Sequence, residues 1–227
     1  MISNVRGGNS MCISCRTLHK LFIIIFFASA FNTAIAGDTH QKLPTACQTK
    51  CTSPYGTTLG ESPRGIKAYS NCQSGCVIFE PNKWHGTYTG IKWQCVEYAR
   101  RWLLINTGTV FGDVDIAADI WGKIDHLTDV KTKKKIPLDT RLNGSLQAPE
   151  VGDLLIYAKA FNGTGHVSVV TGMDNKTNTV EVSEQNFNNA SWSNNYARKI
   201  ALIKNGVNYW LLDGYILGWK HPMFNPQ

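Results

Sequence analysis

One cysteine of this chain has no evident partner and stands where a helix is predicted to begin. Of the seven cysteines, Cys12 and Cys15 precede an apolar leader, four more form two Cys-x-x-x-Cys pairs, and Cys95 is left over. Free N–H groups and the positive end of the helix dipole favour a thiolate at a helix N-terminus. Cys95 is therefore a candidate nucleophile, and the alternative is a buried, unreactive cysteine.

A histidine and a glutamate downstream could complete a set of residues for cysteine hydrolysis. His166 follows a glycine-rich loop, and Glu184 opens the sequence Glu-Gln-Asn. An imidazole can accept and return a proton near neutral pH, and a carboxylate partner fixes its tautomer and stabilises the imidazolium. With Cys95 as the nucleophile, these residues predict a catalytic Cys-His-Glu triad that cleaves an amide through a thioester.

Three predicted strands would carry the histidine and the glutamate. A buried strand spans residues 151–157, a second spans 166–172, and a third spans 179–186. A hairpin centred on Asn175 would place His166 directly opposite Glu184, where antiparallel partners share a face with Cβ atoms about 5 Å apart. This requires an odd-numbered loop, because a slip of one residue would turn Glu184 to the other face.

The residues after Cys95 follow the period of a helix. On one face, Ala99, Trp102 and Leu103 recur four, seven and eight residues after the cysteine. Gly108 is a natural stop signal. We expect a helix from Cys95 to just before Gly108, with the cysteine in its first turn on the side that packs inward.

Four cysteines flank a segment rich in glycine, proline and serine. They are Cys47, Cys51, Cys72 and Cys76. Four cysteines allow three disulfide connectivities, and the sequence does not choose among them; nested pairing would hold the two ends of the segment together. A zinc site is the alternative, but the spacing and an oxidising compartment favour disulfides. We therefore expect neither a metal nor a cofactor.

The first 36 residues have the pattern of a secretory signal peptide. Basic residues precede a dense apolar run at 21–27, and the run ends in Ala34-Ile35-Ala36. An uncleaved membrane anchor is the alternative, but the stretch from Leu21 to Ala36 has 16 residues, fewer than the roughly 20 that span a bilayer. We expect cleavage after Ala36, a secreted or periplasmic location, and no stable membrane span afterwards.

Length and charge limit the domain count and the class of partner. Residues 1–36 carry three basic residues and no acidic residue, so the net charge falls from +7 to +4 without them. This mild excess is compatible with an anionic surface such as a cell wall and is too small to predict nucleic-acid binding. We expect one domain, made of a disulfide-bonded segment at 37–80 and a catalytic core at 81–222, with a tail at 223–227.

The motifs together resemble the CHAP family of cysteine amidohydrolases and peptidases. Within it they are most similar to the amidase domains of glutathionylspermidine synthetase/amidases. The likeness rests on Gln-Cys-Val-Glu-Tyr-Ala-Arg-Arg-Trp at 94–102, Gly-Asp-Leu-Leu-Ile at 152–156, Thr-Gly-His-Val-Ser-Val-Val at 164–170 and Glu-Gln-Asn at 184–186. It implies an α+β, papain-like CHAP fold in which the nucleophile helix packs on an antiparallel sheet.

The resemblance also assigns roles to residues around the triad. It implies that Gln94 and the backbone N–H of Cys95 form the oxyanion hole, and that Arg100 and Asn186 bind substrate. The implied substrate is a polyamine conjugate or a peptide, cleaved at an amide bond. A peptidoglycan stem-peptide hydrolase is the alternative that the leader favours, and a non-catalytic module that binds cell wall or a partner is a second one.

Overall fold

The computed structural model describes residues 44–224. The predicted signal peptide, residues 37–43 and the end of the predicted tail at 225–227 lie outside the described residues. Among residues 44–224, no helix is both long and apolar enough to cross a membrane.

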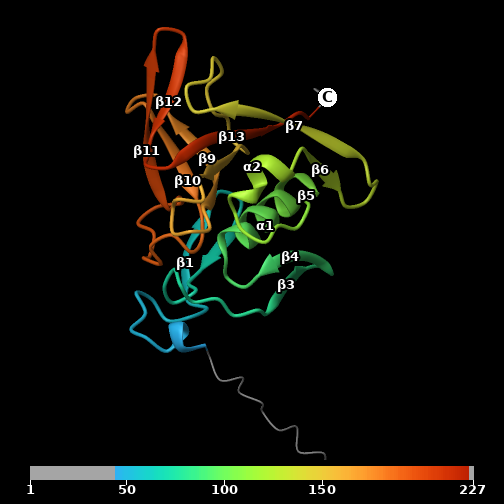
Figure 1. The fold of residues 1–227 in the computed structure, drawn as a ribbon, viewed down its shortest axis with the longest axis vertical. Helices are drawn as coiled ribbons and strands as arrows, with labels where there is room; N and C mark the ends of the chain where they lie inside the picture. The colour runs from blue at the N-terminus through green and yellow to red at the C-terminus, as the bar shows by residue number, and fades with distance from the viewer. Residues whose placement is uncertain (1–43, 225–227) are drawn as a thin grey trace, which may run out of the picture. The chain divides into compact units, whose positions relative to one another are not determined.

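A large antiparallel sheet is the main element of the described chain. Within residues 44–224, nine strands pair in the order β12-β11-β10-β9-β8-β13-β7-β6-β5 (Figure 1). Their bounds are β5 Thr109–Phe111, β6 His126–Asp129, β7 Lys135–Leu142, β8 Leu154–Tyr157, β9 His166–Asp174, β10 Thr179–Ser183, β11 Arg198–Asn205, β12 Asn208–Leu212 and β13 Ile216–Pro222. With two α-helices beside this sheet in the same part of the chain, the predicted α+β class is confirmed.

The helix predicted after Cys95 is confirmed at both ends. Helix α1 spans Cys95–Thr107, and Gly108 follows it with φ of 70°. This left-handed backbone is the one that glycine adopts without steric cost, so Gly108 ends the helix. The prediction that Cys95 lies on the side of the helix that packs inward is also confirmed, because Cys95, Ala99 and Leu103 are buried.

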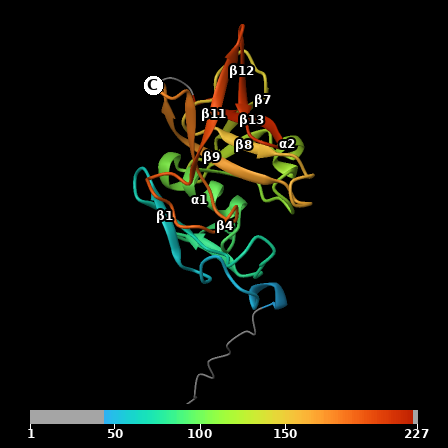
Figure 2. The ribbon, with the colours of Figure 1, turned by 90° about the vertical axis from the view of Figure 1, so that its left-hand side faces the viewer.

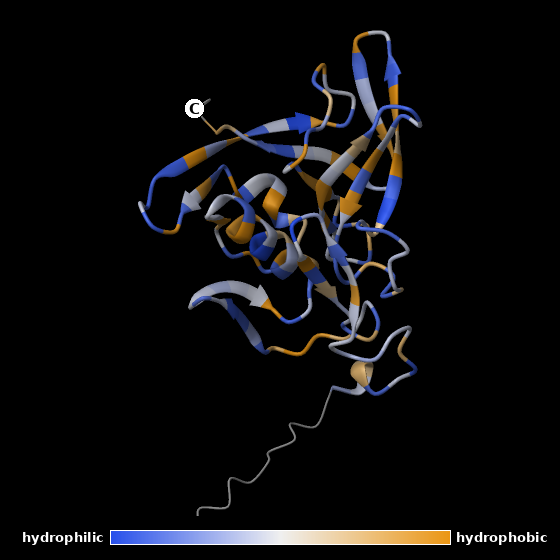
Figure 3. Cartoon of the chain, turned by 180° about the vertical axis from the view of Figure 1, so that it is seen from behind, coloured by the Kyte–Doolittle hydropathy of each residue, from blue (hydrophilic) through white to orange (hydrophobic). Residues whose placement is uncertain are grey.

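Helix α1 packs against the sheet through one hydrophobic core. Its buried residues join those of β8 and β9 in a single cluster, which includes Tyr98, Leu103, Ile156 and Val167. Figure 2 shows α1 beside β8 and β9 in a second view. The same helix also carries strongly hydrophilic residues (Figure 3), and three of these, Glu97, Arg100 and Arg101, are buried.

Smaller elements complete the described chain. They are the 3-10 helix η1 Thr45–Cys47, the hairpin β1 Thr58–Ser62 with β2 Ile66–Tyr69, the hairpin β3 Pro81–Trp84 with β4 Thr87–Ile91, and the short helix α2 Asp119–Lys123. Of these smaller elements, β4 and β2 contact α1, and β5 of the large sheet contacts it as well.

The four early cysteines form two nested disulfides. Cys47 pairs with Cys76, and Cys51 pairs with Cys72. These sulfurs pack with Ile78 and Tyr55 in a small cluster of their own. The nested connectivity thus holds the two ends of the segment together, and no thiolate is left there for zinc.

Candidate active site

Cys95 lies at the N-terminus of α1, on the wall of a cavity. Gln94 occupies the N-cap position directly before it. Cys95 is the free cysteine of the described residues, and 7% of its surface is exposed. The cavity has a volume of about 670 Å³, and Gln94, Cys95 and His166 all line it.

His166 stands between the thiol and a carboxylate. It opens β9 and is 1% exposed. Its Nε2 lies 2.8 Å from Oε2 of Glu184, which is 3% exposed, and the imidazole also hydrogen-bonds the Cys95 side chain. Because Nε2 is engaged by the carboxylate, Nδ1 is the nitrogen left for the thiol.

The register that brings Glu184 to His166 differs from the predicted one. Asp174 pairs with Thr179, so the turn is an even-numbered one at residues 175–178, and the predicted centre at Asn175 is wrong. An even-numbered turn alone would point Glu184 away. A bulge at Thr171 inserts one extra residue into β9 and restores the parity.

Continuing this register beyond Ser183 puts Glu184 opposite Ser168 rather than opposite His166. Ser168 and His166 share a face of β9, because side chains alternate along a strand. The shared face is therefore confirmed, and the carboxylate reaches the imidazole diagonally across the two strands.

The three side chains shift one another's proton affinity. Burial alone would raise the pKa of Cys95, but the charge and hydrogen bond of His166 bring that pKa below its usual value. Burial would lower the pKa of His166, but Cys95 and Glu184 raise it to about 9. Burial likewise opposes ionisation of Glu184, while the charge of Arg198 and the contact with His166 lower its pKa. At neutral pH the arrangement favours a thiolate beside an imidazolium.

This charge pair predicts the pH dependence of cysteine alkylation. We expect iodoacetamide to modify Cys95 rapidly at pH values below the usual thiol pKa of about 8.5. In His166→Ala the inflection of the alkylation rate against pH should move to higher pH, because the group that lowers the thiol pKa is gone. Measuring the alkylation rate against pH for both proteins checks this. Identical inflections would contradict the pairing of Cys95 with His166.

Arg198 supports the glutamate, and sequence reasoning missed it. Its Nε lies 2.6 Å from Oε1 of Glu184, and it donates to the hydroxyl of Tyr157 at 2.6 Å. It also pairs with Asp213, which accepts from Tyr157 at 2.7 Å. The guanidinium lies 4.0 Å from the ring centre of Phe187. Arg198 pairs with Val182 across β10 and β11, so a predicted strand after Glu-Gln-Asn would have been the signal for it.

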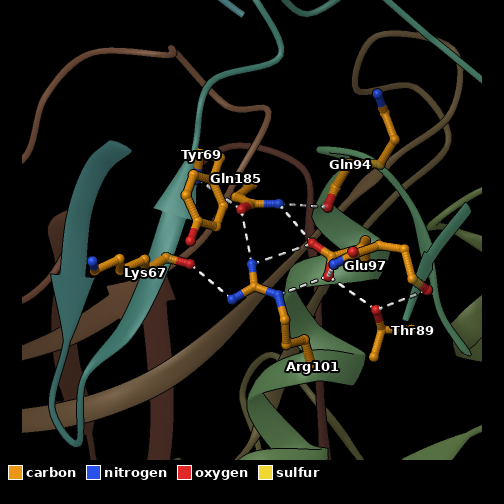
Figure 4. Close-up of polar contacts among 8 residues, drawn as sticks. Lys67, Tyr69, Thr89, Gln94, Glu97, Arg101 and Gln185 are labelled. Carbon is orange, nitrogen blue, oxygen red and sulfur yellow. Dashed lines mark hydrogen bonds and ion pairs between the residues drawn. The ribbon is translucent and has the colours of Figure 1, made fainter. Parts of the chain in front are cut away.

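A second buried network fixes the start of α1, and sequence reasoning missed it too. Arg101 and Glu97 form an ion pair at 2.7 Å, and Gln185 accepts from Arg101 at 3.0 Å and donates to Glu97 at 3.0 Å (Figure 4). Gln185 also donates to the backbone carbonyl of Gln94 at 3.3 Å. Gln185 thus links the segment after β10 to Gln94, the residue directly before Cys95.

Of the two residues predicted to bind substrate, Asn186 lines the cavity and Arg100 does not. Asn186 lines the cavity and donates to Oε1 of Gln94 at 2.5 Å. Arg100 lies behind the wall, where it contacts Asp113 at 3.3 Å and the carbonyl of Tyr88 at 3.2 Å. Burial lowers the pKa of Arg100. Its role in substrate binding stays a prediction.

The cavity lining combines apolar side chains with two carboxylates. These belong to Asp113, which also pairs with Arg100, and Asp115, and we call the two the acidic edge. Neither lysine nor arginine occurs among the described residues that line the cavity. The apolar side chains of the wall include Val77, Ile91, Val114, Ile116 and Phe161. Such a site suits a ligand with a cationic group.

Part of the chain matches a known domain family, and most of it is similar to part of longer enzymes. The family profile of the CHAP domain matches residues 86–186. The bifunctional glutathionylspermidine synthetase/amidase of Escherichia coli strain K12 is 35% identical, over 74% of this chain and 29% of the relative. Trypanothione synthetase of Crithidia fasciculata is also 35% identical, over 68% of this chain and 24% of the relative. The chain thus spans less than a third of the length of these relatives.

Proposed function

From the match of residues 86–186 to the CHAP-domain family, we propose that the protein hydrolyses an amide of the glutathionylspermidine kind with Cys95 as its nucleophile. The family and the amidase relatives support a cysteine amidase hydrolase in general. The observation that carries the proposal is the free thiol of Cys95 beside the His166–Glu184 pair, on the wall of a 670 Å³ cavity. Helix α1 beside an antiparallel sheet fits the papain-like arrangement that we also propose.

The proposed reaction uses the side chains in sequence. The Cys95 thiolate attacks the amide carbon, and the protonated His166 gives its proton to the leaving amine. Glu184 keeps the imidazole in the required tautomer. Gln94 and the backbone N–H of Cys95 stabilise the oxyanion, where loss of one donor costs roughly 10²–10³ in rate. Water, activated by the now neutral His166, hydrolyses the thioester.

The acidic edge of the cavity supports a substrate with a cationic amine. Asp113 and Asp115 line the same cavity as Cys95, and the spermidine part of the proposed substrate is positively charged at neutral pH. An exposed carboxylate attracts such a group by up to about 1 kcal/mol, screened by salt.

Replacing Asp115 with Asn tests the contribution of this edge. We expect KM for glutathionylspermidine to rise roughly two- to fivefold, with kcat unchanged and the difference smaller at high salt. Asp125→Asn is the matched control, because Asp125 is also exposed and does not line the cavity. An unchanged KM in Asp115→Asn would argue against a cationic subsite there.

Export supports a second candidate substrate. Two disulfides are consistent with an oxidising compartment, and we propose a secreted or periplasmic protein cleaved after Ala36. A peptidoglycan stem peptide would be within reach there, and a cell-wall-binding module without turnover is the remaining alternative.

Incubating the mature protein with glutathionylspermidine and, separately, with peptidoglycan fragments tests the proposal. We expect released spermidine from the first substrate. Release of stem-peptide amine alone would assign the second candidate. Release from neither, with fragments bound, would replace the proposed hydrolase by a binding module.

A further inference from the structure

A closed set of hydrogen bonds links the disulfide-bonded segment to the side chain of Gln94. Gln94 donates through Nε2 to the carbonyl of Cys76 at 3.1 Å, and its Oε1 accepts from Asn186 at 2.5 Å. Asn71 completes the set by donating through Nδ2 to the same Cys76 carbonyl at 2.9 Å and to Oδ1 of Asn186 at 2.9 Å. Both ends of the Gln94 carboxamide are therefore held by partners that Asn71 also contacts.

Asn71 is in a position to act through these contacts. It is fully buried, and its backbone N–H donates to the side chain of Asn189 at 3.0 Å. That contact ties it to the loop that carries Asn186. Asn71 itself does not line the cavity, so any effect on the reaction passes through Gln94 and Asn186.

The two disulfides hold the backbone around the Cys76 carbonyl and Asn71 in place. Cys47–Cys76 anchors the residue whose carbonyl receives both amides, and Cys51–Cys72 anchors the residue next to Asn71. Residues between and after these cysteines, including Ser74, Gly75 and Val77, line the cavity. The disulfide-bonded segment is thus part of the wall that faces the thiol.

We propose that Asn71 and the Cys76 carbonyl, anchored by the Cys47–Cys76 disulfide, position the Gln94 carboxamide as an oxyanion donor. The inference rests on the proposed function. One Nε2 hydrogen of Gln94 is taken by the Cys76 carbonyl, which leaves the other available to an oxyanion in the cavity that Gln94 lines. A carboxamide that rotates freely would lose stabilisation of the transition state more than binding of the substrate, so kcat falls while KM changes little.

Replacing Asn71 with Ala tests the positioning. We expect kcat to fall about 10- to 100-fold, less than the roughly 10²–10³ for loss of a donor, with KM within threefold of wild type. The rate of Cys95 alkylation by iodoacetamide should stay within about twofold, because substitution at a saturated carbon develops no oxyanion. In a Gln94→Ala background, Asn71→Ala should change kcat no further, since the donor to be positioned is absent. Gln73→Ala is the matched control, because its side chain bonds within the same segment, to Ala46, and it lies off the cavity wall.

A second variant keeps the test decisive if Asn71→Ala does not fold. The double substitution Cys47→Ser with Cys76→Ser leaves the Cys76 carbonyl in the chain but removes its anchor, and we expect the same loss of kcat with alkylation preserved. Unchanged kcat, or a fall in alkylation that parallels the fall in kcat, would overturn the positioning. If wild-type protein released no amine from any amide, the proposed function itself would fail. If the wild-type protein releases amine and Asn71→Ala has the same kcat, only the positioning proposal is contradicted.

Discussion

Replacing Cys95 with Ala is expected to lower kcat for amide hydrolysis by more than about 10⁴-fold, since loss of a nucleophile leaves only binding and oxyanion stabilisation. The change should not disturb the fold. Cys95 is small and buried at the start of α1, and the His166–Glu184 contact at 2.8 Å does not depend on it. Steady-state release of spermidine, measured alongside the thermal unfolding temperature, checks both expectations.

Cys95→Ser is the matched companion of this variant. It keeps the shape of the side chain but replaces the thiol with a hydroxyl of far higher pKa, so we expect it to be nearly as inactive as Cys95→Ala. Turnover at the wild-type rate in Cys95→Ala, from protein with the wild-type unfolding temperature, would refute the assignment of the nucleophile.

Replacing Glu184 with Gln is expected to lower kcat by roughly 10²–10⁴-fold, because a neutral amide no longer fixes the tautomer or stabilises the imidazolium. The pKa of His166 should fall from about 9, because the carboxylate that raises it is gone. The pH above which activity declines should fall with it, since the leaving amine needs the protonated imidazole. A pH profile of kcat for wild type and Glu184→Gln measures both effects.

Arg198 supplies the control for this prediction. Removing the charge of Glu184 leaves Arg198 with Asp213 and Tyr157, so the fold should persist. Arg198→Lys keeps a positive charge beside the carboxylate and should reduce kcat less than Glu184→Gln. Activity of Glu184→Gln within twofold of wild type would show that the carboxylate has no part in the reaction.

Local patterns in the sequence were enough to predict α1 and the shared face of His166 and Glu184. The helix has a clear period, and its end at Gly108 follows from the backbone freedom of one residue. The same-face relation of His166 and Glu184 follows from the two-residue period of strands. Each of these features depends on residues that are close in sequence.

The predicted hairpin register was wrong because two local features offset one another. An even-numbered turn at 175–178 and a bulge at Thr171 together keep Glu184 on the face of His166. A bulge of this kind has no composition that distinguishes it from the strand around it. The prediction that His166 and Glu184 share a face was therefore correct, although the residue directly opposite Glu184 is Ser168 and not His166.

Contacts between distant segments could not be predicted from the sequence. Arg198 reaches Glu184 because β11 pairs with β10, and Asn71 reaches Asn186 across 115 positions of the chain. The nested disulfides were one of three possibilities until the fold brought their ends together. The buried pair of Glu97 and Arg101 likewise includes a hydrogen bond from Gln185, which lies just after β10 in the chain.

Mass spectrometry of acid-quenched protein during turnover of glutathionylspermidine tests the central claim most directly. We expect a fraction of the mature protein to carry the γ-glutamyl-cysteinyl-glycyl acyl group as a thioester, located by peptide mapping to Cys95 and missing from Cys95→Ala. Turnover that places the acyl group on another residue, or that proceeds in Cys95→Ala, would contradict it.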